Sequence, residues 1–150
     1  MNMLPRVALV SMLLLLGAVG AHAAGCDAPS PHIRPGTTMA DLPEAAANFA
    51  GTWQGQWPIA VKDHIVPICA RLYISVNGPQ TATIEQCTGS ARTARRKAEC
   101  RQFAGEINGN FMTFSDLQGT VYSLTIADVG GMKAEATSAQ HRSVTVFQKQ

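Results

Sequence analysis

The sequence predicts an all-β protein: a single antiparallel up-and-down barrel of about eight strands, with a short N-terminal helix and disulfide bonds. First, short stretches with an apolar residue at every second position recur from residue 49 to the C-terminus. Second, turn signals such as Asn108-Gly109 separate these stretches at short, regular intervals. Third, four cysteines follow an export signal, and none forms a Cys-x-x-Cys pair that would indicate zinc or redox chemistry.

Residues 1–24 are predicted to be a secretory signal peptide. They carry one charged residue, Arg6, then a leucine-rich uncharged run, and then Ala21-His22-Ala23. The run is short for a membrane span and no stop-transfer cluster follows it, so we expect cleavage after Ala23 or Ala24 and a periplasmic or secreted protein. The alternative is lipidation of Cys26, because residues 23–26 resemble a weak lipobox. The even cysteine count favours disulfides instead.

Residues 25–40 form the expected proline-rich, extended lead-in, and residues 41–150 the barrel domain. A short helix is expected over residues 41–48, because Asp41 is a capping-type residue and strong helix formers follow Pro43. This helix would close one end of the barrel.

The first strand is expected over residues 49–57. Its aromatic residues fall on one face and its amides on the other, as in a half-buried strand. Two glycines on the aromatic face permit the curvature that barrel closure needs. The aromatic face comprises Phe49, Gly51, Trp53, Gly55 and Trp57.

The later strands follow from the same alternation. Residues 59–67 are mixed in character and their boundaries are unclear, whereas residues 68–76 and 81–87 are expected to form a hairpin around Asn77-Gly78-Pro79. Residues 88–97 have no apolar period and are expected to form an exposed loop. The remaining strands are expected at residues 98–107, 110–115, 120–127, 132–138 and 142–149.

The cysteines constrain how the strands are linked. Cys69, Cys87 and Cys100 each fall opposite the apolar face of a strand, so the bridges should lie outside the barrel. Cys87 can bond Cys100 across neighbouring strands, which leaves Cys26 for Cys69. The competing pattern joins Cys69 to Cys87 and Cys26 to Cys100, and the sequence favours the first only slightly.

Two sets of residues are candidates for binding. An apolar pocket inside the barrel would be lined by Trp53, Trp57, Leu72, Phe103, Tyr122 and Leu124, which would otherwise be ordinary core residues. A basic cluster, Arg92, Arg95, Arg96, Lys97 and Arg101, would bind anions such as lipid headgroups, phosphates or an acidic partner, or would simply be a solvated loop.

No residue pattern indicates catalysis, a metal site or a cofactor. His32, His64 and His141 form no pair with metal-ligand spacing, and no serine or cysteine lies in a nucleophile motif. The formal net charge is +2, which gives no indication of nucleic-acid binding.

The motif Phe49-x-Gly51-x-Trp53, preceded by a short helix and followed by a meander, resembles the calycin superfamily of lipocalins and fatty-acid-binding proteins. The resemblance implies a barrel whose base is closed by Trp53, with an arginine near the last strand packed over its ring. Arg142 is the nearest candidate for that arginine. Because a fold does not determine a function, the resemblance implies only a barrel able to hold a ligand.

The expected function is therefore that of an exported, non-enzymatic binding protein for an apolar or anionic small molecule or an envelope component. The alternative is a protein-binding inhibitor that acts through its rim or its N-terminal segment. This second hypothesis rests on a resemblance to exported bacterial barrels that inhibit secreted metalloproteases, in which an extended N-terminal segment enters the target. Residues 25–39 would play that part, with Cys26 tethering them.

Overall fold

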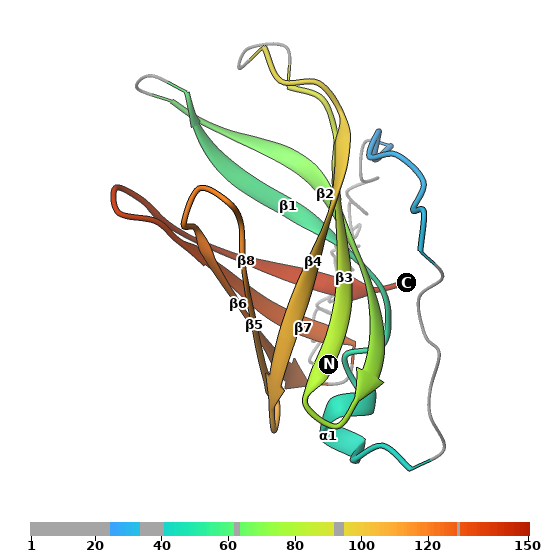
Figure 1. The fold of residues 1–150 in the computed structure, drawn as a ribbon. Helices are drawn as coiled ribbons and strands as arrows, with labels where there is room; N and C mark the ends of the chain where they lie inside the picture. Colours follow the sequence, from blue (N-terminus) through green and yellow to red (C-terminus); the bar gives the residue numbers. More distant parts are fainter. Residues whose placement is uncertain (1–24, 34–40, 62–63, 92–94, 129) are drawn as a thin grey trace, which may run out of the picture.

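The computed structural model describes residues 25–33, 41–61, 64–91, 95–128 and 130–150. Each strand pairs with the next in antiparallel fashion and the last returns to the first, so the sheet closes into an eight-stranded barrel (Figure 1). The elements are α1 (Glu44–Ala47), β1 (Gly51–Val61), β2 (His64–Gly78), β3 (Thr81–Thr88), β4 (Glu99–Asn108), β5 (Phe111–Ser115), β6 (Val121–Asp128), β7 (Gly131–Thr137) and β8 (Arg142–Lys149). None of the described helical structure has the length and hydropathy of a membrane span.

The predicted fold class is confirmed, but local details differ: the helix is shorter than expected, the first strand continues past residue 57, and Thr88 and Ala91 are buried although residues 88–97 were expected to form an exposed loop. Helix α1 is only four residues long, and Asp41 does not cap it, because Pro43 occupies the N-cap position without a side-chain hydrogen bond. The mixed segment 59–67 belongs to strands, since β1 and β2 pair from Gly51↔Ile74 to Val61↔His64. Pro58, just before this segment, is tolerated because it lies beyond the pairing of β1 with β8, and Pro67 is tolerated because it lies beyond the pairing of β2 with β3.

Helix α1 covers the end of the barrel at which β1 begins. The Trp53 Nε1–H donates a hydrogen bond to the carbonyl oxygen of Phe49 at 2.8 Å, and both residues are fully buried. The Lys149 ammonium lies 5.3 Å from the centroid of the Trp53 ring. The expectation that Arg142 covers this ring was wrong, because its guanidinium bonds Glu135 and lines a cavity at the other end of the barrel.

The half of the barrel next to α1 is filled by its own side chains. Inward-facing residues from most strands exclude solvent almost completely, and each large apolar side chain buried this way contributes roughly 1.5–3 kcal/mol. This core comprises Leu72, Ile74, Ile84, Met112, Leu124, Met132 and Phe147, with Phe49 and Trp53 at its base.

The opposite end of the barrel is open, because two strand pairs separate there. Strand β8 pairs with β1 only at Trp53↔Lys149 and Gln54↔Gln148. Further along, the Thr145 and Ser143 hydroxyls bond the β1 carbonyls of Gln56 and Pro58 instead. Strand β4 pairs with β5 over only three residues, and the two strands diverge above their shared hairpin (Figure 1). The result is a funnel that is closed at α1 and wide at the far end.

Two disulfides, Cys26–Cys69 and Cys87–Cys100, hold the lead-in and the outer face together. This is the pairing that the sequence favoured, and the sulfurs lie outside the barrel as expected. Cys87 is nevertheless fully buried, because the lead-in packs over it with Ala28 against Tyr73. The described part of the lead-in is therefore fixed to the barrel wall.

Candidate functional site

The candidate site is a cavity of about 620 Å³ at the open end, within the size range of small-molecule sites. Alternation along each strand turns these side chains inward: Phe103 shares a face with Gly105 and Ile107 of β4, and Gln86 shares a face with Ile84 of β3. The main lining residues are Gln86, Thr88, Arg96, Glu99, Arg101, Phe103, Asp116 and Tyr122, with Ile59, Ile65 and Val144 at the rim.

An aromatic group forms the floor of the cavity. The Trp57 ring meets the Tyr122 and Phe147 rings edge-on, with centroids 5.7 and 5.5 Å apart. Phe114 stacks on Tyr122 at 4.7 Å and lies 5.1 Å from Phe103. Phe103 and Tyr122, which are only partly buried, therefore offer the cavity an apolar, polarisable surface, and the buried rings of Trp57, Phe114 and Phe147 pack against them.

Two buried polar atoms near the floor have no partner among the described residues. Trp57 Nε1 and Thr88 Oγ1 are both shielded from solvent, and both belong to residues that line a smaller hollow of about 100 Å³ beneath the main cavity. Leaving a buried donor or acceptor unpaired costs about 1–3 kcal/mol, so such atoms are rare in folded proteins. A polar ligand atom that reached either one would recover that atom's share of the energy.

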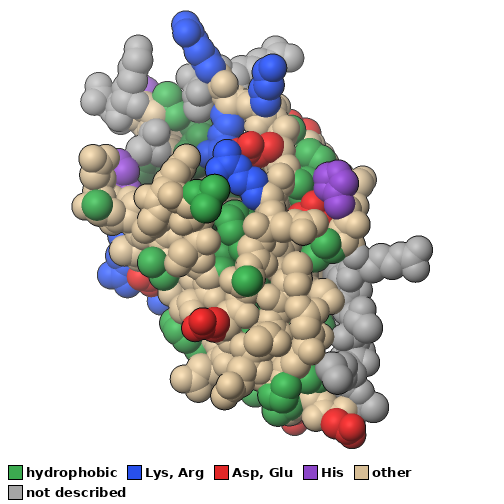
Figure 2. Space-filling model, in the orientation of Figure 1, with side chains coloured by type: hydrophobic (Ala, Val, Ile, Leu, Met, Phe, Trp, Pro, Cys, Tyr) green, Lys and Arg blue, Asp and Glu red, His purple; other side chains and the backbone are tan. Residues whose placement is uncertain are grey.

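Basic side chains lie above the aromatic floor. The Arg101 guanidinium contacts a Glu99 oxygen at 3.1 Å and that of Arg96 contacts it at 3.5 Å, and all three side chains are half-exposed. Two positive charges thus share one carboxylate, which leaves the cluster with a net positive charge. Figure 2 shows basic side chains gathered at this end of the molecule with acidic ones beside them.

Asp116 fixes the other side of the rim. Its carboxylate accepts hydrogen bonds from the backbone N–H groups of Gln118 and Thr120, both at 2.9 Å, and from the Tyr122 hydroxyl at 3.4 Å. Burial acts to raise the pKa of Asp116, but these hydrogen bonds outweigh it and the pKa is lowered. Burial, and then the Asp116 charge, raise the pKa of Tyr122, so Tyr122 remains a neutral donor.

The sequence predicted an apolar pocket and a basic cluster as two separate sites, whereas the structure brings some residues of each set together and leaves the others elsewhere. Of the interior set, Trp57, Phe103 and Tyr122 line the two hollows, whereas Trp53, Leu72 and Leu124 lie deeper, in the packed core. Of the basic set, Arg96 and Arg101 line the cavity, Arg95 and Lys97 are exposed outside it, and Arg92 is outside the described residues. One site therefore joins members of both sets.

Sequence reasoning did not single out Gln86, Thr88 or Asp116. Ala82, Ile84, Gln86 and Thr88 share the inward phase of β3, so continuing the alternation past Ile84 would have placed two polar residues inside the barrel. No comparable signal marks Asp116, whose role depends on how the β5–β6 turn folds back on itself.

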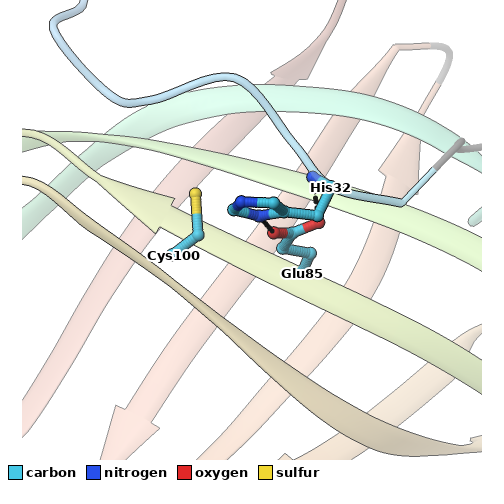
Figure 3. A group of neighbouring side chains, drawn as sticks. All are labelled: His32, Glu85 and Cys100. Carbon is cyan, nitrogen blue, oxygen red and sulfur yellow. Dashed lines mark hydrogen bonds and ion pairs between the residues drawn. The ribbon is translucent and has the colours of Figure 1, made fainter.

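A second cluster lies on the outer wall, where His32, Glu85 and Cys100 approach one another (Figure 3). Cys100 is bonded to Cys87, so its sulfur is not available as a thiolate ligand. Glu85 instead accepts hydrogen bonds from the backbone N–H groups of His32 and Ile33, and from the His32 ring at 2.7 Å. The cluster therefore holds the lead-in against the barrel wall.

No protein-family model matches this sequence, and no curated protein matches it. Among solved structures, a de novo designed fluorescence-activating β-barrel has a TM-score of 0.52 and 15% sequence identity, covering 72% of this chain and 99% of its own. A redesigned β-barrel has a TM-score of 0.48 and 16% identity, covering 71% and 95%. At this identity the likeness to the fluorescence-activating barrel shows the barrel fold alone. Membership of the calycin superfamily is not confirmed.

Proposed function

We propose that the protein is an exported, non-enzymatic binding protein that holds a small molecule in the open end of its barrel. The observation that carries the proposal is the pair of buried, unpartnered atoms, Trp57 Nε1 and Thr88 Oγ1, beside an otherwise well-formed cavity. A ligand that enters this hollow would meet an indole N–H that donates and a hydroxyl that adapts its direction.

The cavity favours a ligand with an apolar body and an anionic group. Phe103 and Tyr122 in the cavity and Trp57 in the smaller hollow offer apolar contact area. Three arginines, Arg96, Arg101 and Arg142, line the cavity against two carboxylates, Glu99 and Asp116, so its guanidinium groups outnumber its acidic groups. A long-chain carboxylate has both parts, and no cofactor is needed to bind it.

Export is supported by the signal-like residues 1–24 and by the two disulfides, which persist in oxidising compartments. The bond between Cys26 and Cys69 argues against lipidation at Cys26, because one sulfur cannot form both a disulfide and a thioether.

The test is a titration with oleate, followed by tryptophan fluorescence, in parallel with oleyl alcohol as a neutral ligand with the same tail. We expect a saturable response to oleate. Because Trp57→Phe also removes a fluorophore, oleate binding to this variant is measured by isothermal titration calorimetry, and we expect it to be largely lost. Arg101→Gln should weaken oleate binding by roughly fivefold or more, since a charge-assisted contact contributes about 1 kcal/mol in a half-exposed site, and should leave the alcohol unchanged. Lys133→Gln, which removes an exposed charge on β7, is the matched control.

Three results would contradict the proposal: no saturable response to either compound, an undiminished response in Trp57→Phe, or an equal loss of oleate affinity in Lys133→Gln and Arg101→Gln. Equal affinities for oleate and oleyl alcohol would show that the cavity binds an apolar chain but does not recognise an anionic group.

The inhibitor hypothesis has no specific observation in its favour. Residues 25–33 lie against the barrel wall, held by the Cys26–Cys69 bond, by Asp27 bonded to Ser90, and by the hydrogen bonds to Glu85. A segment held in this way is not a free extended chain able to enter a target's active site.

A further inference from the structure

The cluster on the outer wall gathers atoms that can bind a metal from three parts of the chain (Figure 3). A ring nitrogen of His32, a carboxylate oxygen of Glu85 and the Cys100 sulfur all lie within 4.8 Å of one another. The Cys87 sulfur adds a fourth such atom, because it is bonded to that of Cys100. Sequence spacing gives no sign of this cluster, because the pairing of β3 with β4 and the path of the lead-in bring its members together.

The hydrogen bond between His32 and Glu85 prepares the imidazole ring for a metal. Burial acts to raise the pKa of Glu85, but hydrogen bonds from the lead-in outweigh it and lower the pKa, so the carboxylate is ionised and can only accept. The His32 Nδ1 atom, 2.7 Å from Glu85 Oε1, therefore carries the donated proton, and in the neutral ring Nε2 keeps a free lone pair. Figure 3 shows the ring between the Glu85 carboxylate and the Cys100 sulfur.

We propose that reduction of the Cys87–Cys100 bond converts this cluster into a zinc site. The two thiolates and His32 Nε2 supply three ligands, and Glu85 orients the ring, as carboxylates do for many zinc-binding histidines. Two sulfurs and an imidazole favour Zn²⁺ over Mg²⁺ or Ca²⁺, and three protein ligands leave a fourth position for water. This site goes beyond small-molecule binding, because it lies on the outer wall beneath the lead-in and not in the funnel.

In the oxidised protein the disulfide blocks the site, and its reduction balances as follows. Cys100 is half-buried and 77% of the His32 side chain is exposed, so a dithiol can reach the bond from solvent. The dithiol supplies two electrons and two protons, which leave Cys87 and Cys100 as thiols, and itself becomes a disulfide. Zinc then displaces both thiol protons. Two Zn–S bonds of about 2.3 Å hold the sulfurs roughly 3.8 Å apart, within reach of side chains on directly paired residues.

The first test compares Zn²⁺ affinity before and after reduction by a phosphine, which is used because dithiols themselves bind zinc. We expect the reduced protein to bind a single zinc ion roughly 100-fold or more tightly than the oxidised protein. Co²⁺ in its place should show sulfur-to-metal charge-transfer absorption. The double variant Cys87→Ser/Cys100→Ser should lose this binding, whereas Cys26→Ser/Cys69→Ser, which removes the other disulfide, should keep it.

The second test distinguishes a folded site from thiols that bind zinc in an unfolded chain. We expect His32→Ala and Glu85→Gln each to weaken Zn²⁺ binding to the reduced protein by roughly tenfold or more, whereas His64→Ala, which removes an exposed imidazole at the start of β2, leaves it unchanged. Equal affinities of His32→Ala and His64→Ala would overturn the proposal even if reduction loosened the fold. So would equal binding by the oxidised and reduced wild type, or undiminished binding by Cys87→Ser/Cys100→Ser.

Discussion

At the scale of single residues, the Glu85 carboxylate shows how a charge can be buried on the outside of a barrel. Only 1% of the residue is exposed, because the lead-in covers it. Burial raises the pKa of Glu85, but hydrogen bonds from the His32 ring and from the Ile33 and His32 backbone outweigh burial and lower it. The charged carboxylate is thus the form that holds the lead-in.

We expect Glu85→Gln to lower the free energy of unfolding at pH 7 by about 1–3 kcal/mol, the range for a hydrogen-bonded buried charge. The pKa of Glu85 is lower in the folded than in the unfolded chain, so its stabilisation is fully present above the unfolded pKa, which is about 4.3. It is lost as the pH falls through the folded pKa. The difference between wild type and variant, measured by urea unfolding, should therefore shrink between pH 7 and pH 3.

Glu106→Gln is the matched control, because Glu106 is exposed on β4 and should leave the free energy of unfolding within about 0.5 kcal/mol. A difference between Glu85→Gln and wild type that stays constant from pH 7 to pH 3 would mean that the charge of Glu85 does not hold the lead-in.

At the scale of elements, the seam between β1 and β8 depends on Gly55. A Cβ atom at this position would lie 2.8 Å from the Val146 carbonyl oxygen and 3.0 Å from the Phe147 ring. Because a backbone oxygen cannot move without opening the seam, Gly55→Ala should destabilise the fold by about 1–3 kcal/mol in chemical unfolding. Gly25→Ala, whose Cβ would meet no atom within 4 Å, should have little effect. Equal stability of the two variants would show that the seam relaxes freely.

Most elements could be predicted from the sequence because their alternation is regular and one face is buried. The β1–β2 hairpin was not recognised, because Pro58 and Pro67 interrupt the pattern. Each of these prolines is tolerated because, at that position, its strand pairs with a strand on one side only. That condition depends on the barrel's closure, which local sequence does not contain.

The candidate site was predicted in two separate parts for a similar reason. Alternation indicated that Trp57 and Tyr122 face inward, and composition indicated a basic loop near Arg96. Arg101 has the inward phase of Phe103 on β4, so the same alternation would have placed it inside the barrel. What the local pattern did not show is the divergence of β4 from β5, which opens this end of the barrel. Strand divergence is a property of pairing register over long sequence distances, so no local pattern could indicate it.

At the scale of the whole molecule, the barrel divides into a packed half and an open half. The packed half combines α1, fully buried apolar side chains and paired strands. The open half combines two separating strand pairs, unpartnered buried polar atoms and exposed apolar residues such as Ile65 and Leu117. Function is expected in the less stable half, because binding regions are drawn from the parts of a protein that open at low free-energy cost.

This division predicts a gradient in native-state hydrogen exchange. Amides of Ile74, Ile84 and Leu124 should exchange only through global unfolding, whereas those of residues 56–61 and 99–105 should exchange through local opening at least 100-fold faster. Oleate at saturation should slow amide exchange in residues 56–61 and 99–105, because a ligand in the funnel contacts both of its diverging walls. The difference in exchange rate between these residues and the packed core should therefore become smaller. Uniform exchange along all strands would contradict the division. Slowing confined to the α1 end would place the ligand elsewhere.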